Sequence, residues 1–329
     1  MSTIIADGPL PHPTGTDGST RKVGVELEFG GVSAEQAAAT VARVYDARAE
    51  RVSAQQFDVR VKELGKFGVE LDARWTHPEF VRGKIEDLPE SWRDGLDVTI
   101  ADLVASLAGT VMPVEIVAPP IAHDRLGRLQ PLIRALAEAG AEGTKHSNVQ
   151  GFGMHLNVEV ASTAPDYLLS VLRAYVLLAA ALRREARLDP IRQLQSYIDP
   201  FSVAYARHIL RPAYAPDTET LIRDHIGFHP TRNMELDMLP VFSDIAPGLV
   251  AELLPEEKNS PRPAFHWRLP DCRIDEPGWD FLDDWRRWIS VERLAADKAL
   301  LDEEAERFLL GGPQSEIEAR LGRLRDALG

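Results

Sequence analysis

The chain has 329 residues, 44% of them hydrophobic, which is enough to bury a sizeable core in one large domain. Its 51 acidic residues outnumber 37 lysines and arginines, and the formal net charge of −14 argues against sequence-independent nucleic-acid binding, because phosphates would be repelled from most of the surface. Cys272 is the only cysteine, so no internal disulfide can form, which suits the cytoplasm as the predicted location.

The first residues and the longest apolar run argue against targeting and membrane segments. Residues 1–20 are polar and rich in Gly, Pro and Thr, which predicts a flexible lead-in and not a signal peptide or anchor. No apolar run reaches the roughly 18 residues needed to cross a bilayer. The closest, 167–182, is interrupted by Arg173 and predicts a buried helix that begins after Thr163 and Pro165. We therefore expect no membrane association.

Residues 23–30 place Glu26 and Glu28 two positions apart in an otherwise apolar strand flanked by glycines. Because alternate residues of a strand share a face, the two carboxylates lie side by side while the apolar residues between them point into a core. A cation would relieve their repulsion, so the pattern is typical of a Mg²⁺ site. Taken alone, it is equally consistent with an antiparallel strand that has one solvated face.

The same alternation of polar and apolar residues recurs in four later segments, 67–75, 111–120, 151–160 and 263–271. Their polar positions offer Glu, Asp, His and Asn with almost no lysine, a set that suits hard cations better than an ordinary solvated face. In chain order, these polar positions include Glu70, Asp72, Glu115, His155, Asn157, His266 and Arg268. Together, the five strands predict one acidic, metal-binding face of a sheet.

The segments 56–64 and 67–75 predict a hairpin that turns near Gly65. A hairpin makes an antiparallel component of the sheet, and strands mixed with long helical segments indicate the α+β class. The segment 227–239 is a dense polar cluster between helical stretches and predicts a loop. We expect this loop to line the site that binds an acceptor substrate. An ordinary surface loop is the alternative interpretation of this segment.

Helices are predicted at both ends of the chain. Ser33 and Gln36 form a capping box ahead of a helix over 34–48. The segments 278–310 and 315–328 are amphipathic, which predicts helices that pack on the sheet or form a contact between two copies in a homo-oligomer.

Four motifs, taken in order, resemble the amidoligases of the carboxylate-amine ligase superfamily, relatives of glutamine synthetase and glutamate–cysteine ligase. They are GVELEF at 24–29, VEIVAPPI at 114–121, GFGMHLNVEV at 151–160 and RPAFHWRLPDCRI at 262–274. The resemblance implies a glutamine-synthetase-like catalytic antiparallel sheet with packed helices and a helical C-terminal tail. The expected boundaries are a lead-in over 1–20, a catalytic domain over 21–275 with a helical insertion at about 165–255, and C-terminal helices over 276–329.

The resemblance also implies an ATP-dependent ligase that joins a small-molecule or peptide carboxylate to an amine through an acyl phosphate, with Mg²⁺ or Mn²⁺ bound. The implied metal ligands are Glu26, Glu28, Glu115, His155 and His266. The implied ATP- or substrate-binding residues are Asn157, Asn259 and Arg232. The implied catalytic residues are Arg268, Arg262 and Asp72, although a surface salt bridge is an equally good interpretation of Arg262.

One residue departs from the family pattern. A glutamate usually stands two positions before the arginine of the last strand, and His266 takes its place here. An imidazole suits Mn²⁺ better than Mg²⁺. Two alternative functions remain open at this point: phosphoryl transfer to a guanidino or amine group, and a non-catalytic relative that binds nucleotide or peptide.

Overall fold

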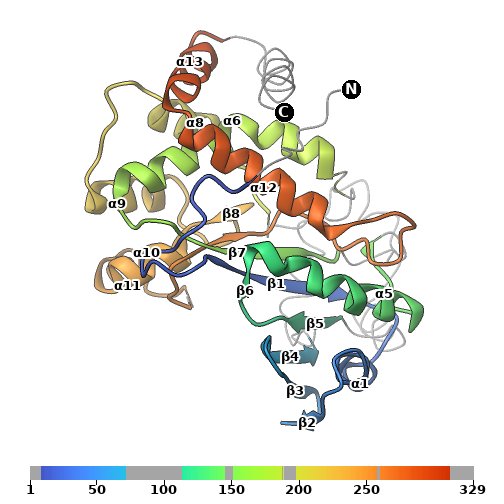
Figure 1. Cartoon of the computed structure of the whole chain (residues 1–329). Coiled ribbons are helices and arrows are strands. Elements are labelled where there is room, and N and C mark those ends of the chain that lie inside the picture. The colour runs from blue at the N-terminus through green and yellow to red at the C-terminus, as the bar shows by residue number, and fades with distance from the viewer. Residues whose placement is uncertain are drawn as a thin grey trace, which may run out of the picture.

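The computed structural model describes residues 9–71, 113–144, 151–186, 188, 198–257 and 260–311. The strands are β1 Lys22–Phe29, β2 Ala49–Arg51, β3 Gln56–Val61, β4 Gly65–Leu71, β5 Val114–Val117, β6 Ile121–Ala122, β7 Met154–Glu159, β8 Leu236–Asp237 and β9 Ala264–Trp267. In the described part of the chain they form a nine-stranded sheet in the order β2-β3-β4-β5-β1-β7-β9-β8, with β6 paired to the start of β1 (Figure 1). Neighbouring strands pair antiparallel throughout.

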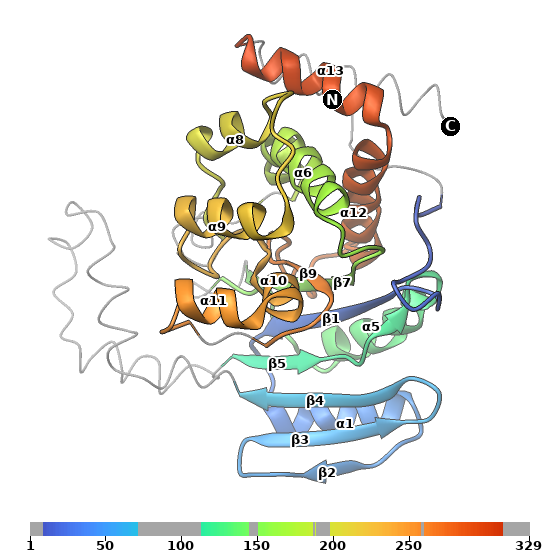
Figure 2. The same cartoon turned by 90° about the vertical axis from the view of Figure 1, so that its left-hand side faces the viewer.

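The helices are α1 Ala34–Val44, α5 Gln130–Glu138, α6 Pro165–Ala186, α8 Val203–Ile209, α9 Thr218–Phe228, α10 Leu239–Ile245, α11 Pro247–Leu253, α12 Phe281–Ala296 and α13 Lys298–Leu309. Helix α1 contacts β3, β4 and β5, and α5 packs beside α1 (Figure 2). Helices α6 and α12 pack together, and a side chain from each contacts Trp267 on β9. One sheet beside packed helices confirms the predicted α+β class.

One face of the sheet is buried beneath these helices, as the alternation of the strands predicts. The apolar residues of β1 are between 0 and 2% exposed. On β9, Trp267 donates a hydrogen bond from Nε1 to the hydroxyl of Tyr175 on α6, at 3.1 Å. Its ring centroid lies 5.7 Å from that of Trp288 on α12. The alternate residues of the same strands therefore carry their side chains to the opposite face.

The predicted hairpin and its turn are confirmed by β3 and β4, which pair from Gln56 opposite Glu70 to Val61 opposite Gly65. Gly65 has φ +123, a conformation that L side chains rarely adopt. A Cβ atom at this position would also lie 3.0 Å from Cβ of Pro119. Backbone conformation and close packing thus both require glycine at the turn.

The predicted capping box is present: the side chain of Ser33 accepts from the backbone N–H of Gln36, and Gln36 reciprocates. The helix predicted over 34–48 ends earlier, at Val44, and the chain turns through Asp46 at φ 50 into β2. All three residues of β2 are exposed, so this edge strand has no apolar alternation by which the sequence could indicate it.

Helix α6 alone among the described helices is long and apolar enough, by length and composition, to span a bilayer. Twelve of its 22 residues are buried inside the protein, where it packs against α8, α9, α12 and α13. This burial is typical of a core helix, as predicted for 167–182. The predicted helix over 278–310 is present as α12 and α13, with Asp297 as the N-cap of α13, whereas 315–328 lies outside the described residues.

A buried ion pair joins the start of the sheet to α12. Arg21 is fully buried and donates two hydrogen bonds of 2.7 Å to the carboxylate of Glu292. The indole N–H of Trp288 donates to the same carboxylate at 2.8 Å. The three side chains hold the chain that enters β1 against the C-terminal helices. The boundary near residue 275 between catalytic domain and tail stays a prediction.

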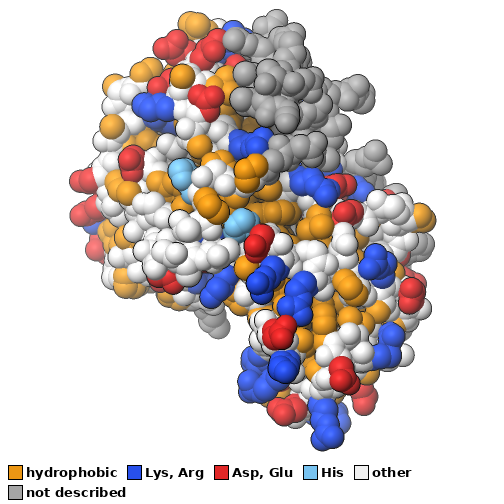
Figure 3. All heavy atoms as spheres, viewed as in Figure 1, with side chains coloured by type: hydrophobic (Ala, Val, Ile, Leu, Met, Phe, Trp, Pro, Cys, Tyr) orange, Lys and Arg blue, Asp and Glu red, His pale blue; other side chains and the backbone are white. Residues whose placement is uncertain are grey.

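The described surface seen in Figure 3 carries charges of both signs. Over the lobe formed by α1 and β2–β4, basic and acidic side chains lie interspersed with hydrophobic ones. Mixed charge of this kind is ordinary for a solvated surface.

Two histidines, His225 at the end of α9 and His229 just after it, are buried in an aromatic cluster with Phe201 and Tyr205. Burial lowers the pKa of His225 to about 3, with help from the nearby His229, and lowers the pKa of His229 to about 4. Tyr205 and His225 share a hydrogen bond of 2.8 Å through Nδ1 of the imidazole. The folded protein therefore holds both imidazoles neutral near pH 7.

We expect acid destabilisation from this pair as the pH falls below 6.5, down to about pH 4 for His229 and about pH 3 for His225. Their folded pKa values lie below the unfolded value near 6.5, so the unfolded state takes up protons first as the pH falls, and the free energy of unfolding decreases. From pH 7 to pH 5 each histidine should cost about 1–2 kcal/mol. Urea denaturation across this pH range measures the slope.

In the same series, His225→Gln should flatten that slope, whereas Phe201→Leu should lower stability by a similar amount at every pH, since it removes packing without a titrating group. An unchanged slope in His225→Gln would contradict the assignment.

Candidate metal centre

The register of the three central strands brings the predicted metal ligands together. Glu26 on β1 lies opposite His155 on β7, and Asn157 on β7 lies opposite His266 on β9. All four have side chains on the face of the sheet that carries the polar residues, because His155 and Asn157 are two positions apart on β7 and residues directly opposite each other on paired strands share a face. The alternation of polar residues along each strand therefore becomes a patch that crosses three strands.

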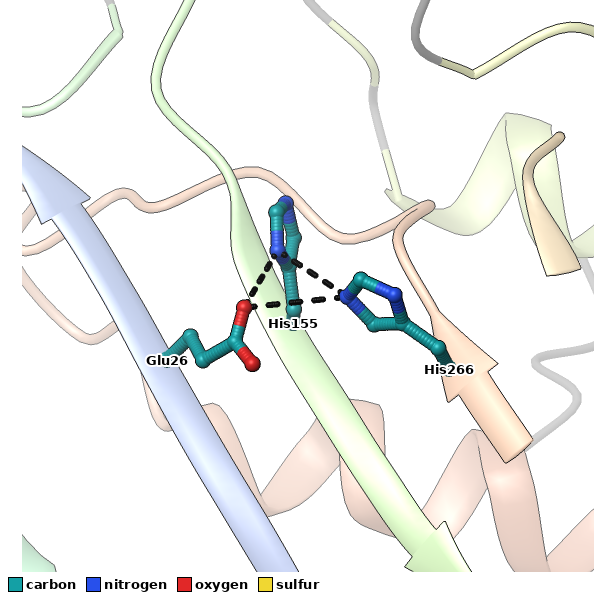
Figure 4. A group of neighbouring side chains, drawn as sticks. All are labelled: Glu26, His155 and His266. Atoms are coloured by element: carbon teal, nitrogen blue, oxygen red, sulfur yellow. Dashed lines mark hydrogen bonds and ion pairs between the residues drawn. The ribbon is translucent and has the colours of Figure 1, made fainter. Parts of the chain in front are cut away.

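Three ligand atoms converge at the centre of this patch (Figure 4). Oε2 of Glu26 lies 2.9 Å from Nδ1 of His155 and 3.6 Å from Nε2 of His266, and the two imidazole nitrogens lie 3.4 Å apart. The group meets the geometric requirement for holding one metal ion. Glu26, His155 and His266 are called the triad below.

The triad fits a divalent ion by size as well as by chemistry. A triangle with these three sides has a circumscribed circle of radius about 1.9 Å, so a point about 2.1 Å from all three atoms exists on either side of the plane through them. Bonds of about 2.0–2.2 Å are those that Zn²⁺ makes with imidazole and carboxylate, and Mg²⁺ bonds to oxygen are as short. Two imidazoles with one carboxylate form a donor set that favours transition-metal ions.

The electrostatics of the triad favour an ionised glutamate next to neutral imidazole. Burial by itself would raise the pKa of Glu26, but its contacts with His155 and His266 outweigh burial and hold that pKa well below its usual range. Burial lowers the pKa of His155, and this effect outweighs the attraction of the neighbouring glutamates. A carboxylate and a neutral imidazole are the protonation states in which these side chains bind metal ions.

Asp237 and Arg268 lie next to His266. Oδ2 of Asp237 is 3.3 Å from Nδ1 of His266 and 3.1 Å from Nη2 of Arg268, and all three residues are buried. Burial would raise the pKa of Asp237, but the contacts with His266 and Arg268 lower it overall. The segment 227–239 is thus not entirely a loop, because it contains β8, whose Asp237 pairs in register with His266.

The alternation of polar and apolar residues over 263–271 predicted that Arg268 lies inside the last strand, but β9 ends one residue earlier, at Trp267. Its backbone N–H still donates to the carbonyl of Glu235, at 2.9 Å, which extends the contact with the segment that enters β8. The side chain of Arg268 is 3% exposed and forms the ion pair with Asp237.

Arg262 and Asn157 connect the triad to a more exposed part of the sheet. Nδ2 of Asn157 donates to Oε1 of Glu26 at 2.7 Å, and Arg262 donates from two nitrogens to Oδ1 of Asn157. Arg262 also donates to the carbonyl of Ser260, at 3.0 Å. Burial lowers the pKa of Arg262, against the attraction of Glu26. These contacts place the guanidinium of Arg262 next to the triad.

A row of carboxylates extends from the triad across the sheet. Glu28 lies opposite Glu115 on β5, which lies opposite Glu70 on β4. Oε1 of Glu28 is 3.9 Å from Nε2 of His155, and its Oε2 accepts from the backbone N–H of Gly153 at 2.8 Å. The predicted acidic face is therefore continuous from β4 to β1.

Other predicted residues are not placed at the triad by the contacts described. Arg232 follows α9, and its backbone N–H lies 3.4 Å from Oε1 of Glu257. His229, part of the same polar cluster, belongs to the aromatic cluster described above. Asp72 and Asn259 lie outside the described residues. The roles predicted for Arg232, Asp72 and Asn259 stay predictions.

An antiparallel sheet whose polar face carries a histidine–carboxylate cluster next to one buried and one half-buried arginine defines the class: an α+β protein with a candidate metal-dependent active site. The chain belongs to the family described as "Putative amidoligase enzyme", whose model matches residues 19–290. Membership indicates an enzyme of the ligase type. No significant match occurs among curated proteins or among solved structures.

Proposed function

We propose that the protein is an ATP-dependent ligase that joins a carboxylate to an amine through an acyl phosphate. The observation that carries the proposal is the triad, with the row of carboxylates beside it, on one sheet face of a chain that belongs to the amidoligase family. The substrates in the proposal are a small-molecule or peptide carboxylate and an amine.

The reaction requires activation of the carboxylate, which is a poor electrophile. In the proposed sequence, the carboxylate oxygen attacks the γ-phosphorus of ATP, the bond to ADP breaks, and an acyl phosphate forms. The amine then attacks the acyl carbon, phosphate leaves with the bonding electrons, and the amine loses a proton to give the amide. Because charge develops on phosphate oxygens, neutralising that charge is the main task of the site.

The residues of the triad supply what such a site needs. Glu26, His155 and His266 would hold a divalent ion, Mg²⁺ or Mn²⁺, which when bound supplies positive charge for the triphosphate. Glu28 and Glu115, which face each other across β1 and β5, are candidates for holding a second ion.

The arginines have the complementary role in the proposal. Arg262 presents its guanidinium beside Glu26 through Asn157, and a guanidinium offers paired donors to phosphate oxygens. Asn157 would orient phosphate or nucleotide.

Trapping with hydroxylamine tests the proposed intermediate. An acyl phosphate should react with this small amine, which needs little of the specific acceptor pocket, and yield a hydroxamate. We expect incubation with Mn²⁺ or Mg²⁺, ATP and a panel of amino acids and acidic peptides to give ADP and a hydroxamate in equal amounts. Iron-complex colorimetry and mass spectrometry measure the product, and Glu26→Gln serves as the inactive control.

Two outcomes would contradict the proposal. A stable phosphorylated amine would indicate phosphoryl transfer to nitrogen, which is the second candidate function. ADP formation that depends on neither acid nor amine would indicate adventitious hydrolysis. A relative that binds nucleotide without turnover is favoured by the replacement of the family glutamate by His266, and ATP binding with no product from any acid tried would support it.

A further inference from the structure

Asp237 contacts the ring nitrogen of His266 that does not face Glu26. We infer that Asp237, held by Arg268, is a positioning residue that fixes His266 as an ion ligand through Nε2. The inference rests on the metal centre of the proposed function. It assigns the β8 segment to support of that centre, whereas the sequence suggested a loop that lines the acceptor site.

Both oxygens of Asp237 have defined partners. Oδ1 accepts from the backbone N–H of Leu239 at 2.9 Å, and Oδ2 meets Nη2 of Arg268 at 3.1 Å and Nδ1 of His266 at 3.3 Å. Asp237 is 2% exposed and Arg268 is 3% exposed, so solvent screens these contacts weakly. A guanidinium bound to one oxygen and a backbone donor on the other hold the carboxylate in one orientation.

That orientation determines which tautomer His266 adopts. An ionised carboxylate only accepts hydrogen bonds, so Nδ1 of His266 must carry the proton that lies between them. In the neutral ring, which is the form that binds metal ions, Nε2 is then bare, and its lone pair points toward Glu26 and His155, which lie 3.6 Å and 3.4 Å away. A histidine that donates from its second nitrogen to a carboxylate is the usual arrangement of imidazole ligands, and the partner fixes the ring and increases ligand basicity.

Asp237 therefore compensates for the exchange of a family glutamate for His266. A glutamate needs no outer partner to present a charged oxygen, whereas a histidine must hold the correct tautomer. The supported imidazole should favour an ion that accepts nitrogen ligands, such as Mn²⁺, over Mg²⁺.

Direct ion binding by the full chain tests the role of Asp237 without any turnover assay. Titration with Mn²⁺, followed by the electron paramagnetic resonance signal of the free ion, should show binding to Asp237→Asn that is weaker by about 10- to 100-fold. Mn²⁺ binding to His266→Ala should be weakened at least as much. The matched control is Asp224→Asn, which alters a second Asp–His pair, 2.8 Å from Nε2 of His208, and should bind Mn²⁺ as the unaltered chain does.

The tautomer itself is a second readout, which a purely structural role would not change. Long-range ¹H–¹⁵N spectra of the ring-labelled unaltered chain should show His266 protonated on Nδ1, and this measurement decides the matter if Asp237→Asn fails to fold. Protonation on Nε2 would overturn the inference, as would a folded Asp237→Asn that binds Mn²⁺ with unaltered affinity. If the unaltered chain binds no divalent ion, the proposed metal centre fails together with the inference.

Discussion

Glu26→Gln should abolish divalent-ion binding and lower turnover by more than about a hundredfold, since it removes the one carboxylate of the triad. Thermal melts with and without Mn²⁺ or Mg²⁺ and ATP measure the first effect, and product formation measures the second. In the unaltered chain the ion and nucleotide together should raise the melting temperature, whereas Glu26→Gln should show no such increase.

Glu26→Gln should also destabilise the ion-free protein by about 1–3 kcal/mol. Adjacent Glu26 and Glu28 suggest from sequence that losing one charge would relieve repulsion. The structure indicates the opposite sign, because Glu26 accepts from Asn157 and lies 2.9 Å from His155, and its pKa is held low. In the Gln variant, the side-chain NH₂ group would face either Nδ2 of Asn157 or Nδ1 of His155, and both of these atoms donate to Glu26 in the unaltered chain.

The control for Glu26→Gln is Asp58→Asn, which removes a carboxylate from the same polar face on β3, where it pairs with Lys66 at 2.9 Å. That variant should keep ion-dependent stabilisation and turnover. If Glu26→Gln keeps them too, the triad is ordinary sheet surface.

Arg268→Lys should lower kcat by about a hundredfold or more while nucleotide affinity falls less. Arg268 is nearly fully buried and its guanidinium pairs with Asp237, the residue behind His266. A lysine keeps the charge but loses the planar set of donors, so it cannot hold the carboxylate in the same orientation or offer paired donors to phosphate. Steady-state kinetics and nucleotide titration measure the two quantities.

Arg21→Lys is the matched control for Arg268→Lys, because Arg21 forms an equally buried ion pair with Glu292, which connects β1 to α12. It should lower the melting temperature and leave kcat close to that of the unaltered chain. A near-normal kcat in Arg268→Lys would make Arg268 a structural residue.

The polar face could be predicted because alternation along a strand is a local property. Glu26, His155 and His266 each stand among apolar neighbours in a short segment, so the sequence indicates that they share a side of a sheet. The distances between these three side chains could not be predicted, because β1 pairs with β7 and β7 pairs with β9, and the paired strands are more than a hundred residues apart in the sequence. The registers that place Glu26 opposite His155, and Asn157 opposite His266, come from the structure alone.

The position of Asp237 in a strand could not be predicted from local sequence patterns. Its strand has two residues within a mostly helical segment, and two residues are too few to show a period. Its polar neighbours therefore suggested a loop. The strand exists because β9 offers an edge with which β8 pairs, and that edge is contributed by residues further along the chain.

The position of β1 between β5 and β7, with β9 one strand further on, has a consequence for synthesis of the chain. Glu26 leaves the ribosome early, yet its partners on β7 and β9 follow 129 and about 240 residues later. Before β7 is made, β1 can pair only with β5 and β6, so its other edge stays unpaired, a state that is prone to aggregation. Chains that stop before β9 cannot assemble the triad, so any affinity for the ion should appear only once nearly the entire sheet has been made.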